Sequence, residues 1–330
     1  MTPKRIGING FGRIGRALAR ILLHDKRFEI AAINDLADAH GMAHLFKYDS
    51  VHGKLELPVE ATNNSLTVGS VSIPFLQSSH PSQIPWSAYD VDIVVDCTGQ
   101  FKTTEELTGH ITAGARRVLL SVPPEDEKIK TIVLGINEDR ITPEDTILSN
   151  ASCTTNNAAP MIQLIDELCG IESCYITTVH SYTGDQRLHD SPHKDLRRSR
   201  AAALSIIPTT TGAAKALTRV FPHLNEKMGG CGFRVPVPDG SLTDITCNVR
   251  NPISIQAINE AFQQASMHRW AGILDYTEDP VVSVDIIGNP ASCVFDAKLT
   301  SVIGNMVKVV GWYDNEIGYS SRLRDALLSL

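Results

Sequence analysis

The first half of the chain alternates between short apolar runs and stretches with helical spacing of apolar residues. Lys4–Asn9 and Glu29–Asn34 are apolar runs of strand length, and Ile14–Leu23 between them repeats apolar residues at helical spacing. Val91–Asp96 is a continuous apolar run, which is typical of a strand buried on both faces. This repeated alternation predicts an α/β domain with a doubly wound parallel sheet over residues 1–150.

Within the first domain, residues 54–75 alternate as short strands, which predicts an insertion of antiparallel hairpins.

After residue 150 the pattern of apolar and polar positions changes. A helix is predicted over Thr154–Cys169, another over Pro252–Arg269 and a closing helix over Ile317–Leu330. The predicted strands of this half are Glu172–Val179, Gly232–Pro236, Leu242–Arg250, Val281–Ile287, Cys293–Lys298 and Met306–Trp312. Several consecutive strands with little crossover predict an α+β domain with a mixed or antiparallel sheet over residues 151–315.

Composition narrows the classes of function. The net charge of −7 gives no overall attraction to nucleic acid or to an anionic membrane, so neither is expected as the main ligand. No apolar run is long enough to span a bilayer, and the N-terminus lacks the apolar region of a secretion signal. The seven cysteines are scattered and form no C-x-x-C pair, which argues against a disulfide framework or a metal site. We therefore expect a cytoplasmic protein.

A glycine motif follows the first predicted strand. Gly10, Gly12 and Gly15 form G-x-G-x-x-G between a strand and a helix, where they allow a tight turn, the approach of a pyrophosphate and close packing of the helix. Asp35 ends the second strand about 20 residues after Gly15, the position of the acid that binds both ribose hydroxyls. Since a carboxylate there repels a 2′-phosphate, this Rossmann-type domain is predicted to prefer NAD to NADP, although dual use stays open. Thr98 follows a buried strand at the edge where ligands bind.

Cys153 lies among small polar residues immediately before a helical pattern, in the segment Ser149–Asn156. Ser152 or Asn150 can cap that helix by accepting hydrogen bonds from its first amides. The positive end of the helix dipole favours thiolate over thiol, and the free amides favour an oxyanion. The alternative is a buried structural cysteine beside a helix cap.

His180 is the best candidate partner for Cys153 among the eleven histidines. It ends a predicted strand and opens a polar loop, so it can face a cleft, although an isolated histidine is often structural. A cysteine and a histidine so placed can act as nucleophile and base. We expect His180 to keep Cys153 ionised and to accept a proton from the tetrahedral adduct.

Hydroxyl, amide and guanidinium groups of the kind that bind phosphate are dense in the same half of the chain. They are Ser152, Thr154, Thr183, Arg198, Thr211, Gly212 and Arg234. Solvated surface positions are the alternative for the arginines. A dinucleotide site, a thiol, a base and phosphate anchors together imply oxidation of a phosphorylated aldehyde through a thioester, which phosphate or water then attacks.

The chain resembles the phosphorylating glyceraldehyde-3-phosphate dehydrogenases over essentially its whole length. The motifs that carry the resemblance are INGFGRIGR, KYDSVHGK, SNASCTTN, HSYTGDQR, HKDLRRSRAAALSIIPTTTGAAKA, FRVP and GWYDNEIGYS. The resemblance implies that Cys153 is the nucleophile and His180 the base. It implies that NAD is contacted by Arg13, Ile14, Asp35, Thr98, Ser121 and Asn315, with Asn315 on the carboxamide. Inorganic phosphate would bind Ser152, Thr154, Thr211, Gly212 and Arg234, and the substrate phosphate Thr183, Asp185, Arg198 and Arg234.

The family resemblance further implies a homotetramer whose final helix, 316–330, packs back on the first domain. At four places the sequence departs from the family pattern. Asn157 stands where a second cysteine is common, so no local disulfide could protect Cys153, and Ile317 replaces the usual aromatic residue of the last motif. Gln77–His80 lacks an arginine expected beside the adenine, and Val237–Gly240 replaces the commoner Thr-Pro-Asn-Val.

Two rival functions are weighed against this one. The first is erythrose-4-phosphate dehydrogenase, which Leu36–His44 and Asp96–Gly99 resemble, whereas Tyr182–Asp185 and Thr210–Gly212 do not. The second is a non-catalytic protein that senses NAD or binds RNA. The acidic balance and the lack of a basic, aromatic stacking platform argue against RNA.

Overall fold

The computed structural model describes residues 2–330, which form two compact units. The first unit contains the residues up to Ile132, Glu138–Ala151 and Ser320–Leu330, and the second contains Val133–Asn137 and Ser152–Tyr319. Val133–Asn137 therefore falls outside the domain in which the sequence pattern places it. One contact of this segment within the second unit is the hydrogen bond that Trp270 Nε1 donates to Gly135 O at 2.9 Å.

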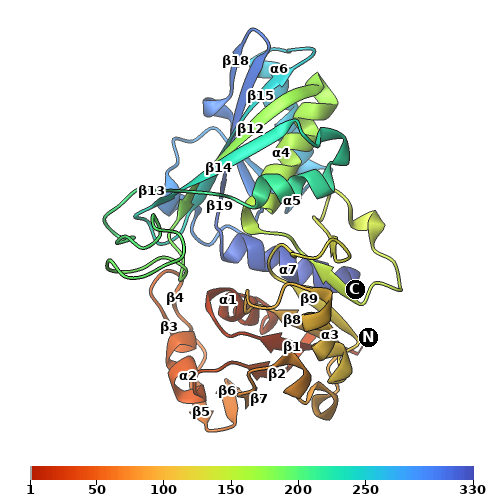
Figure 1. The fold of residues 1–330 in the computed structure, drawn as a ribbon, viewed down its shortest axis with the longest axis vertical. Helices are drawn as coiled ribbons and strands as arrows, with labels where there is room; N and C mark the ends of the chain where they lie inside the picture. The colour runs from red at the N-terminus through yellow and green to blue at the C-terminus, as the bar shows by residue number, and fades with distance from the viewer. Residues whose placement is uncertain (1) are drawn as a thin grey trace. The chain divides into compact units, whose positions relative to one another are not determined.

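The first unit is built on a nine-stranded sheet with the order β10-β11-β9-β8-β1-β2-β7-β6-β5 (Figure 1). Its strands are β1 (Lys4–Asn9), β2 (Phe28–Asn34), β5 (Val59–Thr62), β6 (Ser65–Val68), β7 (Val71–Leu76), β8 (Ile93–Asp96), β9 (Arg117–Leu120), β10 (Lys130–Thr131) and β11 (Ile147–Ser149). From β10 to β7 the neighbours pair parallel, while β5, β6 and β7 pair antiparallel, so the predicted hairpin insertion is confirmed. A separate small ribbon pairs β3 (Tyr48–Asp49) with β4 (Gly53–Lys54).

Crossover helices bury the parallel strands of this unit. They are α1 (Arg13–Leu22), α2 (Ala39–Lys47) and α3 (Thr104–Thr112). Helix α3 begins with a capping box, in which Thr103 and Glu106 each satisfy an amide of the other residue. Ile6, Ile8, Val94 and Val95 are fully buried, as expected for strands covered on both faces.

The second unit is built on an eight-stranded mixed sheet (Figure 1). Seven of its strands follow the order β13-β14-β12-β15-β19-β17-β16, and the eighth, β18, pairs with β19. Its strands are β12 (Ile171–Ser181), β13 (Ile207–Thr209), β14 (Met228–Val235), β15 (Ser241–Val249), β16 (Leu274–Thr277), β17 (Cys293–Asp296), β18 (Ser301–Ile303) and β19 (Met306–Tyr313). Strand β12 pairs parallel with β14 and antiparallel with β15, which confirms the predicted mixed sheet.

Helix α4 (Cys153–Cys169) packs on β15 and β19, and it also contacts α5 (Ala213–Val220) and α6 (Ile255–Met267). The chain ends in α7 (Ile317–Ser329), whose last turns belong to the first unit. There, Lys4 Nζ donates to Leu327 O at 2.8 Å. Within residues 2–330 no helix combines the length and apolar character needed to cross a membrane.

The strand predicted at Val281–Ile287 is wrong. Ser283–Ile286 forms a 3₁₀ turn, in which Asp285 Oδ2 accepts from Val282 N at 2.8 Å. Val282 and Val284 are more than half exposed, so their alternation with polar residues does not mark a buried face. A short acidic side chain that caps a turn outweighs the strand propensity of the valines.

Candidate active site

Cys153 is the first residue of α4, and Ser152 is its N-cap. Ser152 Oγ accepts from Thr155 N at 3.1 Å, which satisfies one of the unpaired amides at the helix start. Burial raises the pKa of Cys153, and hydrogen bonds donated to the sulfur by the backbone and side chain of Thr154 oppose that rise. The local sequence thus builds a helix start that stabilises negative charge on this thiol.

His180 stands near the end of β12 and is buried. Its Nε2 lies 3.4 Å from Cys153 Sγ, and its Nδ1 lies 2.8 Å from Ser181 O. Nδ1 has a second neighbour, Arg234 NH1 at 2.7 Å, which can only donate, so the two contacts call for different tautomers of the ring. We assign the proton to Nδ1, where it is donated to Ser181 O, because this tautomer leaves Nε2 as an acceptor facing the sulfur. The structure therefore brings the two residues together across 27 positions of sequence.

Arg234 completes this group because β14 pairs with β12 in a register that sets Arg234 directly opposite His180. Its guanidinium NH1 donates to Ser181 O at 3.0 Å and lies 2.7 Å from His180 Nδ1. A fixed positive charge therefore lies against the imidazole and acts on the thiol as well.

The electrostatics differ from the expected ion pair. Burial, reinforced by the charge of Arg234, lowers the pKa of His180 to about 3, so the imidazole is neutral at physiological pH. Burial also raises the pKa of Cys153, and Arg234 is the largest influence that lowers it. The positive charge that favours the thiolate in this site therefore comes from Arg234, whereas the sequence analysis assigns it to His180.

Tyr313 is a part of this site that the sequence analysis does not single out. Its hydroxyl lies 2.9 Å from Thr154 Oγ1 and 3.1 Å from Thr178 Oγ1, and its ring meets that of His180 edge-on with 5.9 Å between centroids. Its ring fixes one side of the imidazole. The signal was the quoted motif GWYDNEIGYS, which contains this tyrosine.

Arg198 lies in a second polar cluster, on the loop that follows β12. It forms an ion pair with Asp185 at 2.5 Å and donates through Nε and NH2 to Thr209 Oγ1 at 2.9 and 2.7 Å. Both Arg198 and Asp185 act electrostatically on Arg234, which places this cluster beside the thiol and imidazole. Two guanidinium groups in one place are suited to hold a phosphate.

The remaining predicted anion contacts have partners of their own. Thr183 N and Oγ1 donate to Gln186 Oε1 at 2.8 and 3.0 Å, and Thr211 Oγ1 accepts from Ala213 N at 3.2 Å. Gly212 is the N-cap of α5 and contributes no side-chain hydrogen bond to the helix. A Cβ at this position would meet no atom within 4 Å, so the start of α5 is sterically open.

The first unit contains a pocket of about 290 Å³ at the carboxyl edge of its sheet. Gly10 has φ +90°, and a Cβ there would lie 2.8 Å from Thr98 N. A Cβ at Gly12 would meet nothing within 4 Å. The strand-to-helix turn is therefore one that only glycine fits at its start, and it leaves space above Gly12 for a ligand backbone. The lining residues are Asn9, Gly10, Gly12, Asn34, Asp35, Leu36, Ser78, Ser79, Cys97, Thr98, Gln100 and Phe101.

Asp35 lines this pocket with a fixed carboxylate. Its Oδ2 accepts from Phe11 N at 2.6 Å and its Oδ1 from Ala37 N at 2.9 Å. At the departure from the family pattern, Gln77 Nε2 donates to Ala37 O at 3.2 Å, while Ser78 and Ser79 line the pocket. The pocket wall expected to carry an arginine is therefore neutral and polar.

The other predicted cofactor contacts of this unit are Arg13, Ile14 and Ser121. Arg13 forms an ion pair with Asp49 at 2.7 Å, and Ile14 lies in the first turn of α1. Ser121 is buried, and its amide donates to Asp96 O at 3.0 Å. The pocket residues Asn9 and Asn34 were not predicted from the sequence. Each is the last residue of an apolar strand, and this position was the only indication that the sequence offered.

Asn315 belongs to the second unit and lies two residues after the end of β19. Its Oδ1 accepts from Ser181 Oγ at 2.9 Å and from Ser241 Oγ at 2.6 Å. Because these hydroxyls fix the oxygen, they also set the direction of the amide N–H donors. The amide is thus prepared to donate to an acceptor of a ligand.

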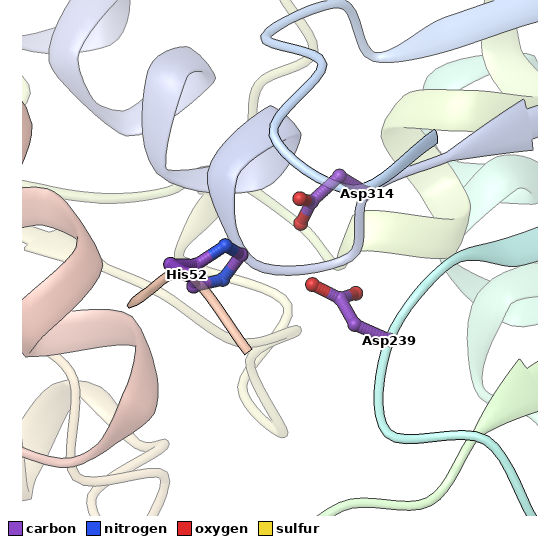
Figure 2. Close-up of side chains that lie close together, drawn as sticks. All are labelled: His52, Asp239 and Asp314. Atoms are coloured by element: carbon purple, nitrogen blue, oxygen red, sulfur yellow. The ribbon is translucent and has the colours of Figure 1, made fainter. Parts of the chain in front are cut away.

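Two carboxyl groups, those of Asp239 and Asp314, accept hydrogen bonds from the backbone at and just after Asn315. Asp239 and Asp314 turn their carboxyl groups toward one another (Figure 2). Burial, with repulsion from Asp314 and Glu316, raises the pKa of Asp239 to about 8. Asp239 Oδ1 accepts from Asn315 N at 3.3 Å, and Asp314 Oδ1 accepts from Ile317 N at 2.7 Å. The pair thereby anchors the backbone on both sides of Asn315.

Both parts of the chain match family models of one kind. Residues 4–104 match the glyceraldehyde 3-phosphate dehydrogenase NAD binding domain, and residues 152–315 match the C-terminal domain of the same family. The chain is 51% identical over 324 residues to glyceraldehyde-3-phosphate dehydrogenase 2 of Streptomyces avermitilis, covering 97% of this chain and 96% of the relative. It is 48% identical over 325 residues to glyceraldehyde-3-phosphate dehydrogenase 2 of Bacillus subtilis, covering 98% and 95%. The enzyme of Geobacillus stearothermophilus with the same family name is 48% identical over 323 residues, covering 97% and 96%.

Proposed function

The chain belongs to the glyceraldehyde-3-phosphate dehydrogenase family, and on that premise we propose that it converts D-glyceraldehyde 3-phosphate and inorganic phosphate reversibly into 1,3-bisphosphoglycerate. It is an NAD-dependent oxidoreductase that acts on aldehyde groups. The observation that carries the proposal is the 3.4 Å separation of Cys153 Sγ and His180 Nε2.

The covalent steps take place on Cys153. Its sulfur adds to the aldehyde carbon while the aldehyde oxygen takes up the proton that the thiol gives up, which forms a thiohemiacetal. His180 Nε2 then accepts the proton of that hydroxyl. NAD, when bound, supplies the oxidant that takes up the aldehyde hydrogen with its electron pair. A thioester remains on Cys153, a phosphate oxygen attacks its carbonyl carbon, and the sulfur leaves as thiolate.

The neutral state of His180 suits it to this role, because a protonated imidazole could not accept the proton. Arg234 lowers the pKa of His180 and favours negative charge on Cys153. One guanidinium therefore adjusts the nucleophile and the base together. The same group, with Arg198, provides the charge that we assign to binding the substrate phosphate and inorganic phosphate. Ser152, Thr154, Thr183, Asp185, Thr211 and Gly212 are assigned to the same anion contacts.

The pocket of the first unit fits NAD. The open space over Gly12 suits a pyrophosphate at the start of α1, and the fixed carboxylate of Asp35 suits the ribose hydroxyls. We assign Arg13, Ile14, Thr98 and Ser121 to the same cofactor. Asn315 is assigned to the carboxamide, since its amide N–H donors are oriented by Ser181 and Ser241.

The reaction is tested by assaying two aldehydes with and without phosphate. We expect formation of an acyl phosphate from glyceraldehyde 3-phosphate that depends on both NAD and inorganic phosphate. Erythrose 4-phosphate is expected to be oxidised with a lower kcat/KM. A higher kcat/KM for the four-carbon sugar together with turnover independent of phosphate would overturn the proposal. The names of the relatives do not favour that alternative.

Replacing Asp35 by asparagine is expected to lower the preference for NAD over NADP by about tenfold, because it removes the charge that repels a 2′-phosphate. Asparagine retains one acceptor oxygen for the amides that hold the side chain. The measurement is the ratio of kcat/KM for the two cofactors. Glu29→Gln, a change of the same kind on the exposed part of β2, is the control. An unchanged ratio in the Asp35 variant would remove this residue from cofactor selection.

The oligomeric state and the cellular location are proposed on the basis of family membership. We infer a homotetramer, as the family resemblance implies, and a cytoplasmic location. All of the cysteines are free thiols, which supports a reducing compartment.

A further inference from the structure

A buried chain of hydrogen bonds runs beneath the NAD pocket of the first unit. It starts at Trp86 Nε1, which donates to His110 Nδ1 at 2.9 Å. His110 Nε2 lies 3.2 Å from Asp96 Oδ2, and Asn9 Nδ2 donates to the same oxygen at 2.8 Å. Trp86, His110 and Asp96 are fully buried. A polar network at this depth is stable only if its members satisfy one another.

The chain continues across the carboxyl ends of the neighbouring strands. Asn34 Nδ2 donates to Asn9 Oδ1 at 2.8 Å, and Asn34 Oδ1 accepts from Ser78 N at 2.8 Å. On the other side, Asp96 Oδ1 accepts from Thr98 N at 3.1 Å and from Thr98 Oγ1 at 2.6 Å. The network therefore links the ends of β8, β1 and β2 to the loop after β7.

The direction of each bond in this chain is determined. The indole N–H can only donate, so His110 Nδ1 must accept and the ring proton sits on Nε2. Nε2–H then donates to Asp96, whose carboxylate can only accept. Asn9 must turn its amide nitrogen to Asp96 and its oxygen to Asn34. Asn34 in turn donates through its nitrogen to Asn9 and accepts through its oxygen from Ser78 N. The orientation of the Asn9 and Asn34 side-chain amides in this hydrogen-bond network therefore depends on Asp96 as an acceptor.

The end members of the network form the pocket itself, since Asn9, Asn34, Ser78 and Thr98 all line it. Their orientation is set before any ligand arrives, which lowers the cost of ordering the site on binding. We propose that Asp96 and His110 are positioning residues for the dinucleotide, acting through Asn9, Asn34 and Thr98 to hold the pocket in its binding shape. The inference rests on the use of NAD stated above.

Asp96→Asn tests the proposal with little change in size. Asparagine can offer its oxygen to Thr98 only by turning its NH₂ group toward the N–H donors of Asn9 and His110. We expect the Kd for NAD, measured by calorimetry, to rise about tenfold, the usual effect of leaving buried partners unpaired. KM for NAD should rise in parallel, while kcat at saturating NAD and the rate of Cys153 alkylation stay within about twofold of the original protein.

Asp92→Asn is the matched control. Asp92 precedes β8, accepts from Arg5 N at 2.9 Å and pairs with Arg116, outside the pocket. It should leave the Kd for NAD unchanged. Trp86→Phe is a second, milder variant. It removes only the indole donor, so the proton of His110 is no longer restricted to Nε2. We expect it to raise the Kd about threefold, so it tests the proposal even if the Asp96 variant does not fold.

A merely structural role gives a different result. In that case both variants would lower the melting temperature of the ligand-free protein and leave the Kd for NAD within twofold of the original, which would overturn the proposal. Failure of the unaltered protein to bind NAD would instead contradict the proposed function. The two failures are therefore distinguishable.

Discussion

Replacing Cys153 by alanine is expected to abolish aldehyde oxidation, with kcat falling by about 10⁵-fold or more. The reason is that no covalent adduct can form without the sulfur at the start of α4. Binding of NAD should be unchanged, because none of the residues that we assign to the cofactor is altered and Cys153 does not line its pocket. The measurement is steady-state production of NADH under saturating aldehyde and phosphate.

Cys231→Ala provides the control for this experiment. Cys231 is a half-buried free thiol on β14, on the same strand as Arg234. This variant should retain the activity of the original protein. Substantial turnover by the Cys153 variant would contradict its assignment as the nucleophile.

Replacing His180 by asparagine or by glutamine is expected to lower kcat by about 10²- to 10⁴-fold, the usual contribution of a general base. Asparagine can still donate to Ser181 O in place of Nδ1, and glutamine can place an amide near Cys153, but neither can accept the proton. Both variants should therefore lose the same function while preserving different parts of the geometry. Single-turnover formation of NADH measures the affected step directly.

The comparison variant is His223→Asn, which alters an exposed histidine paired with Asp166 at 2.7 Å. It should have normal kcat. If glutamine at position 180 kept most of the activity, a hydrogen bond to the sulfur would suffice, and the assignment of His180 as a base would be wrong.

Much of the fold could be predicted from the sequence because the periodicity of apolar residues reports burial. The continuous run that ends at Asp96 and the helical spacing after Cys153 both correspond to observed elements. The strand predicted over Val281–Ile287 was wrong because its apolar residues do not report burial. Its valines are exposed, and a capping aspartate determines the local backbone. Local hydrogen bonds of this kind leave little signal in a pattern of apolar positions.

The candidate site was predictable only in part. Cys153 and His180 each adjoin the end of a predicted element, so their chemistry could be inferred residue by residue. The alignment of His180 with Arg234 depends on the parallel register of β12 and β14, which no local pattern specifies. The influence of Arg234 on both pKa values therefore emerged only from the structure. Asp96 and Asn9 were hidden because polar residues at the ends of buried strands are not distinguishable from turn residues. His110 was hidden because a single histidine inside helix α3 gives no sign of the partners it meets in the fold.

The central claim is that the substrate is oxidised while attached to Cys153. It is tested most directly by mixing the protein with NAD and glyceraldehyde 3-phosphate without inorganic phosphate, quenching in acid and locating the modified peptide by mass spectrometry. We expect the phosphoglyceroyl group on the peptide that contains Cys153, in an amount equal to the NADH formed in the first turnover, and its loss when phosphate is added before the quench. A first turnover of NADH with Cys153 unmodified, or with the acyl group on another residue, would contradict the account.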